Sequence, residues 1–114
     1  MPLTGYISMS VTKDYALDKA GKLIALLKST GMNIHEAYLF GSAVAGQGGE
    51  DSDIDLAIVS KEFTGLPFYD VIKISKYRRS IDLRLGIHPF SLDDIQANPP
   101  LFFLDIQTKG IPID

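Results

Sequence analysis

The sequence contains no cysteine and no apolar run long enough to cross a membrane. Without cysteine, disulfide bonds, thiolate metal ligands and a cysteine nucleophile are all excluded. A membrane-spanning helix needs about 18 or more consecutive apolar residues, and the N-terminus also lacks the charged start and apolar stretch of a signal peptide. These features predict a protein of the reducing cytoplasm that has no membrane partner.

Positive charge is also scarce. The sequence has 11 lysines and arginines but 14 aspartates and glutamates, which gives a formal net charge of -3. Proteins that bind nucleic acid broadly usually present a basic surface, so this balance argues against a nucleic-acid partner. The densest basic cluster consists of Lys73, Lys76, Arg78 and Arg79. Such a cluster is more typical of a solvated helix face.

A length of 114 residues with 46% hydrophobic content is typical of one soluble globular domain. We therefore expect a single domain over residues 1–114, in which residues 1–12, which show no clear period, form a loosely held lead-in. So short a chain leaves little mass for a separate substrate-binding module. A bulky second substrate would need a partner protein to present it.

Hydrophobic periodicity predicts the main helices and strands. Apolar residues at spacings of three and four predict a helix from about Asp14 to Ser29, ended by Gly31, and a second helix that begins at Pro67 and ends near Ser80. A capping pattern at Ser91 and the prolines Pro99 and Pro100 precede a further helical segment. The predicted strands are 34–40, 54–59 and 81–87, and the last helical segment is 101–106. The order α-β-β-α-β-α predicts an α/β fold, α+β in some schemes, with one mixed sheet covered by helices.

Acidic residues lie on two of the predicted strands. Asp53 and Asp55 alternate with Ile54 and Leu56, so their carboxylates project from one strand face about 6–7 Å apart. Asp82 lies on the polar face of strand 81–87 and would join them if the strands are neighbours. Carboxylates grouped in this way can bind two Mg²⁺ ions, which activate an attacking hydroxyl and stabilise leaving phosphate oxygens. Outward polar residues at an exposed strand start would give the same pattern.

A turn at Gly41 and Ser42 follows strand 34–40 and precedes the acids by a glycine-rich loop. Backbone N–H groups in such a turn, together with the Ser42 hydroxyl, can hold the β- and γ-phosphates of a nucleotide. The combination of a phosphate turn with metal-binding acids indicates phosphate chemistry.

The string Phe40-Gly41-Ser42-Ala43-Val44-Ala45-Gly46, followed after six residues by Asp53-Ile54-Asp55-Leu56, resembles a known signature. It is similar to Gly-Ser-x-Ala-x-Gly and Ser-Asp-x-Asp-Leu of the minimal nucleotidyltransferases in the DNA polymerase β superfamily, and Ser52 completes the second motif. The resemblance extends from helix 14–29 to strand 81–87. It implies that Gly41 and Ser42 bind the triphosphate, that Asp53 and Asp55 ligate Mg²⁺, and that Asp82 is a third metal-binding carboxylate that helps to deprotonate the acceptor.

The resemblance also implies an activity and a partner. The family transfers a nucleoside monophosphate, here AMP from ATP, to a hydroxyl and releases pyrophosphate. Its small members are often paired with a helical HEPN protein and act as antitoxins that adenylylate the toxin. Because this chain has Ala45 where the family often has Arg or Lys, we expect weak activity or a basic group from elsewhere. Arg84 is one candidate, and a surface salt bridge is the alternative role for that residue.

Two other functions fit parts of this sequence. The first is a non-catalytic module with the same fold that binds a nucleotide or a partner protein. The second is an EF-hand calcium loop, because Asp51, Asp53, Asp55 and Glu62 occupy its positions 1, 3, 5 and 12. The calcium pattern fails at position 6, which requires glycine and holds Leu56.

Several features receive no assigned role from the sequence. His35 is expected on the surface at a strand start and His88 in a loop, without metal-ligand spacing between them. The apolar segment 101–104 either packs into the core or forms an interface with a second copy or a partner. The base of the nucleotide stays open, and the acceptor is a partner tyrosine, an aminoglycoside-like hydroxyl compound or an RNA end, the last disfavoured by the acidic charge.

Overall fold

The computed structural model describes residues 12–45 and 53–114. Residues 1–11 of the expected lead-in, Gly46 and Ser52 of the motifs, and Asp51 lie outside the described residues. The described helices are α2 (Lys13–Ser29), α3 (Pro67–Ile81), α4 (Leu92–Ala97) and α5 (Leu101–Lys109), and a short 3-10 helix, η1, spans Gly41–Ala43. The described strands are β1 (Ile34–Phe40), β2 (Ile54–Ser60), β3 (Leu85–Ser91) and β4 (Ile111–Pro112).

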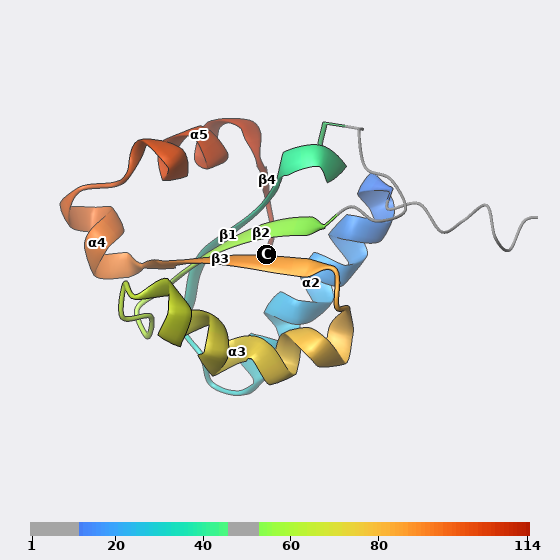
Figure 1. The fold of residues 1–114 in the computed structure, drawn as a ribbon, viewed down its shortest axis with the longest axis horizontal. Helices are drawn as coiled ribbons and strands as arrows, with labels where there is room; N and C mark the ends of the chain where they lie inside the picture. The colour runs from blue at the N-terminus through green and yellow to red at the C-terminus, as the bar shows by residue number, and fades with distance from the viewer. Residues whose placement is uncertain (1–11, 46–52) are drawn as a thin grey trace, which may run out of the picture.

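The strands form one mixed sheet in the order β3-β2-β1-β4. Strand β1 is antiparallel to both β2 and β4, whereas β2 and β3 are parallel. Helices α2 and α3 cover one side of the sheet and α5 lies on the other (Figure 1). The expected mixed sheet covered by helices is confirmed, in the α+β form. Strand β4 was not expected, because a two-residue strand that contains a proline carries no readable period.

The main core lies between the sheet and helices α2 and α3. Helix α2 buries Leu23, Ile24 and Leu27 completely, and these residues belong to one apolar cluster with Leu39 of β1 and Leu56 of β2. All but one residue of β2 is buried, as is typical of a central strand covered on both faces. Because side chains alternate across a strand, the neighbours of Leu39 and Leu56 along β1 and β2 project toward the α5 side of the sheet.

Helix termini follow the expected capping rules at two places. The Thr12 side chain accepts a hydrogen bond from the Tyr15 N–H at 3.1 Å and starts α2, so the last residue of the segment expected as a lead-in caps this helix. The Ser91 hydroxyl accepts the Asp94 N–H at 3.1 Å and starts α4, as the capping pattern predicted.

The strand predicted at 81–87 is wrong in its bounds, because β3 begins only at Leu85. Helix α3 continues to Ile81, Asp82 is its C-cap, and the Leu85 N–H closes a turn onto the Asp82 carbonyl at 3.2 Å. Leu83, expected on the core face, is 71% exposed in this turn. Ile81 fits a helix equally well, since it follows Tyr77 by four residues and packs against the core. His88 consequently lies within β3 and not in a loop.

Leu56 is fully buried within β2, so the Asp53–Glu62 segment is not a calcium-binding loop. Among the helices of residues 12–45 and 53–114, none combines the length and apolar character that crossing a membrane requires.

Candidate functional site

The turn at the end of β1 lies directly against a carboxylate of β2. Phe40, the last residue of β1, pairs with Asp55, and Gly41 follows with a φ of +82°. A Cβ atom on Gly41 would lie 3.3 Å from the Asp55 Cγ and closer still to Oδ2. Only glycine permits both this backbone conformation and this approach. The fold therefore brings the predicted phosphate turn and a predicted metal-binding acid together.

Asp53 and Asp55 share the sheet face that the strand alternation predicted. Gly86 of β3 pairs with Asp55, and a Cβ on Gly86 would lie 3.6 Å from Asp55 Oδ1 and 4.0 Å from Asp53 Cβ. Both acids thus flank a position without a side chain, which leaves open space beside their carboxylates. Two carboxylates in such a place are the ligands that Mg²⁺ commonly takes together with substrate phosphates.

An aromatic group of Phe40, His88 and Phe102 adjoins Asp55. The His88 Nε2 lies 3.3 Å from Asp55 Oδ1, and its ring centroid lies 4.9 Å from that of Phe40. Phe102 of α5 packs edge-to-face against both rings, at 5.8 Å from Phe40 and 6.0 Å from His88. The sequence analysis did not place His88 at this site. Once the bounds of β3 are known, the alternation of side chains along a strand puts Gly86 and His88 on the same face.

Asp82 is held by a different part of the molecule. The Tyr15 hydroxyl donates a hydrogen bond to Asp82 Oδ2, and the Arg84 N–H and Nε donate to Oδ1 at 2.8 and 3.3 Å. The Arg84 guanidinium also lies 4.8 Å from the centroid of the Tyr15 ring. Arg84 therefore takes the salt-bridge role that was its alternative interpretation.

The hydrogen bonds of this cluster shift the pKa values of its members. Burial raises the pKa of Asp82, but hydrogen bonds from Tyr15 and Arg84 outweigh it and hold the pKa of the carboxyl below its usual value. The same hydrogen bond to Asp82 raises the pKa of Tyr15. Asp82 is consequently an ionised carboxylate at neutral pH that is already engaged by a hydroxyl and a cation.

The described residues bring together two of the three predicted acids. Within residues 12–45 and 53–114, no three His, Asp or Glu side chains are grouped closely enough to hold a metal ion. Asp55 lies beside the turn, and Asp53 lies with Asp55 beside Gly86 of β3, whereas Asp82 is bonded to a side chain of α2, the helix that covers the opposite sheet face. The metal-binding role of Asp82 stays a prediction.

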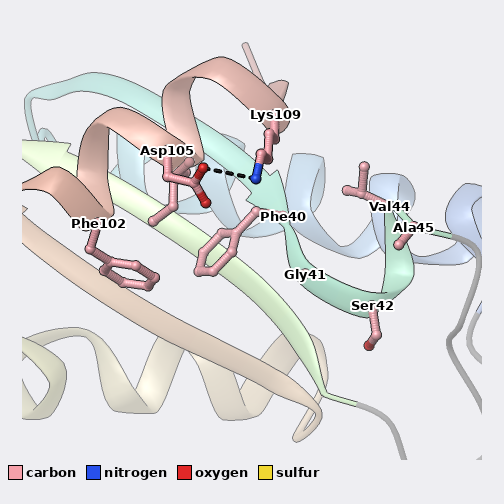
Figure 2. Close-up of a pocket in the computed structure, with 9 residues that line it drawn as sticks. Phe40, Gly41, Ser42, Val44, Ala45, Phe102, Asp105 and Lys109 are labelled. Carbon is pink, nitrogen blue, oxygen red and sulfur yellow. Dashed lines mark ion pairs between the residues drawn. The ribbon is translucent and has the colours of Figure 1, made fainter.

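A pocket of about 500 Å³ opens between the turn and α5 (Figure 2). Its volume lies within the range of roughly 300–1,000 Å³ that is common for small-molecule sites. The turn side and the α5 side are lined by Phe40, Gly41, Ser42, Val44, Ala45, Phe102, Asp105, Ile106 and Lys109. Lys109 pairs with Asp105 at 3.0 Å, and it lines the same pocket as the predicted triphosphate-binding residues Gly41 and Ser42.

The family model described as polymerase beta, nucleotidyltransferase matches residues 21–113. The chain belongs to this family. Because the match runs through α5 and β4, the pocket wall that carries Phe102 and Lys109 is part of the nucleotidyltransferase domain.

The fold of the nucleotidyltransferase domain is also found in a solved structure. A crystal structure of a candidate nucleotidyltransferase from Sulfolobus solfataricus matches with a TM-score of 0.58 and 22% identity, over 75% of each chain. At this identity the likeness shows the shared fold. A search of curated proteins finds no significant match to the sequence.

Proposed function

We propose that this domain is a Mg²⁺-dependent nucleotidyltransferase that moves AMP from ATP to a hydroxyl acceptor in the cytoplasm. The observation that carries the proposal is the approach of Asp55 to Gly41, which places a carboxylate against the turn that would hold the phosphates. The pocket beside this turn supplies space for the nucleotide. Membership of the nucleotidyltransferase family supports the same class of reaction.

In the proposed reaction the acceptor oxygen forms a bond to the α-phosphorus of ATP. The bond from that phosphorus to the bridging oxygen breaks, pyrophosphate leaves, and a carboxylate accepts the proton of the acceptor. Backbone N–H groups of the turn and the Ser42 hydroxyl would orient the phosphates. Asp53 and Asp55 would hold Mg²⁺, which when bound neutralises phosphate charge and promotes ionisation of the attacking hydroxyl.

We further propose that the acceptor is a tyrosine of a helical HEPN-type protein. The support is the resemblance of the Gly41-Ser42 and Asp53-Asp55 motifs to the minimal nucleotidyltransferases, whose small members are often paired with such a protein. The small size of the domain is consistent with a protein acceptor that brings its own binding surface.

The test uses ATP labelled at the α- or the γ-phosphate, incubated with the protein and a HEPN-type protein. We expect label from the α-phosphate alone to appear on tyrosine, and only with Mg²⁺. Asp53→Ala should abolish this transfer, while Asp18→Ala, which removes an exposed acid of α2 in an ion pair with Lys22, should leave it unchanged.

The alternative function, a non-catalytic binding module, predicts a different result. ATP or the partner protein would bind, no label would be transferred, and Asp53→Ala would leave binding of the partner intact. Calorimetric titration of ATP, GTP, CTP and UTP, with and without Mg²⁺, measures binding separately from transfer. Transfer to no acceptor together with normal ATP binding would favour this alternative.

A further inference from the structure

A triphosphate in the pocket would need a nearby positive charge. ATP carries several negative charges, and cations positioned at phosphate oxygens contribute strongly to its binding. Among the described residues that line the pocket, Lys109 is the one with a positive charge, and Asp105 is the one with a negative charge. The turn itself continues into Val44 and Ala45, whose side chains are apolar.

The position of Lys109 is fixed by the pairing of β4 with β1. The register joins Tyr38 to Pro112 and Leu39 to Ile111, so the chain before Ile111 runs back toward Phe40 and Gly41. Gly110 makes this possible, because a Cβ there would lie 2.6 Å from the Ile106 carbonyl oxygen and 2.9 Å from that of Leu39. The last turn of α5 is therefore held close to the residues that begin the turn.

Lys109 is also free to change partner at low cost. Its ion pair with Asp105 is an i,i+4 pair in which the two side chains are 75% and 59% exposed. Exposed pairs of this kind contribute little to stability, so breaking one loses little free energy. Figure 2 shows the pair on α5 at one side of the pocket and the Gly41–Ser42 turn at the other.

We propose that Lys109 binds the β- or γ-phosphate of the triphosphate, and that it leaves Asp105 to do so. The inference rests on the proposed function and adds a binding residue that lies far in the sequence from the turn and the acids. Since the charge acts on the outer phosphates, ATP depends on Lys109 and AMP does not.

The test is calorimetric titration of ATP and of AMP, each with Mg²⁺, into the wild type and Lys109→Gln. We expect Lys109→Gln to bind ATP roughly tenfold more weakly, with AMP changed less than about twofold. The matched control is Lys22→Gln, since Lys22 also forms an exposed i,i+4 pair, with Asp18 at 3.1 Å on α2. Asp105→Asn should bind ATP at least as well as the wild type, because it removes the competing acid.

The outcomes separate this inference from the proposed function. If the wild type binds ATP but Lys109→Gln binds it as well as Lys22→Gln does, the role of Lys109 is wrong and the proposed function stands. An equal loss of ATP and AMP affinity also overturns it, because the effect then does not act on the outer phosphates. If the wild type binds neither nucleotide, the proposed function fails and this inference fails with it.

Discussion

The hydroxyl of Tyr15, on helix α2, donates a hydrogen bond to the carboxylate of Asp82, which caps helix α3 at a distance of 67 residues in the sequence. Arg84 completes the cluster by donating both to Asp82 and to the Tyr15 hydroxyl. The cluster joins the start of α2 to the turn before β3. It holds an acid to which the family resemblance assigns a catalytic role, so we expect changes in this cluster to affect both stability and activity.

Tyr15→Phe should destabilise the protein by about 1 kcal/mol, because a carboxylate with a side chain only 9% exposed loses a hydrogen bond. Chemical denaturation measures this change, and Tyr69→Phe, at a residue 63% exposed, serves as the control with little expected effect. In a double-mutant cycle with Asp82→Asn, the two changes should be non-additive. Simple additivity would show that the contact contributes nothing.

Gly41→Ala should weaken ATP binding strongly, because a Cβ at this position displaces the Asp55 carboxylate. The positive φ alone costs about 1–2 kcal/mol for a residue with a side chain. Gly31→Ala isolates that cost, since Gly31 has a φ of +92° and no atom within 4 Å of the added Cβ. We expect both variants to lose stability and only Gly41→Ala to lose ATP binding in calorimetry. Equal ATP affinity of the two variants would contradict the placement of the site.

Asp70→Ala should be among the most destabilising changes in α3. Asp70 is only 1% exposed, and its carboxylate accepts hydrogen bonds from the Thr64 N–H at 2.8 Å, the Thr64 hydroxyl at 2.9 Å and the Gly65 N–H at 3.0 Å. Loss of these charge-assisted bonds should cost about 3 kcal/mol in urea denaturation. Asp18→Ala, at an exposed acid, should cost less than about 0.5 kcal/mol. A similar small cost for both would refute the role of Asp70 in holding the loop before α3.

Tyr38→Phe should reduce the loss of stability at alkaline pH. Burial and a hydrogen bond to Glu36 raise the pKa of Tyr38 above its ordinary value of 10.0. The folded state therefore holds the phenolic proton more tightly than the unfolded state, and this contribution is complete below the ordinary value and lost as the pH rises through the folded value. Denaturation measured from about pH 8 to 11 should show a shallower decline for Tyr38→Phe than for the wild type. Parallel declines would exclude this contribution.

The sequence was sufficient to predict those helices and strands that have a clear local pattern of apolar residues. Helix α2 and strands β1 and β2 follow the expected bounds to within one residue, because each has a clear hydrophobic period. The common face of Asp53 and Asp55 also follows from alternation within one strand. Short motifs of the same local kind indicated the family, and the family model that matches residues 21–113 shows it.

Local patterns were insufficient where two interpretations fitted equally well. Residues 81–87 alternate like a strand, yet Ile81 also continues the helical spacing of α3, and its packing against the core selects the helix. Because β3 therefore begins only at Leu85, Asp82 lies outside the sheet and His88 lies within it.

The sequence by itself determined the strand face of the acids, the glycine turn and the family of this protein. Only the tertiary structure decided that Asp82 pairs with Tyr15, that His88 contacts Asp55, and that Lys109 lines the pocket beside Gly41. The physical reason is range: alternation and turn conformation depend on residues a few positions apart, whereas these contacts form only when the sheet and its helices pack and bring distant segments together.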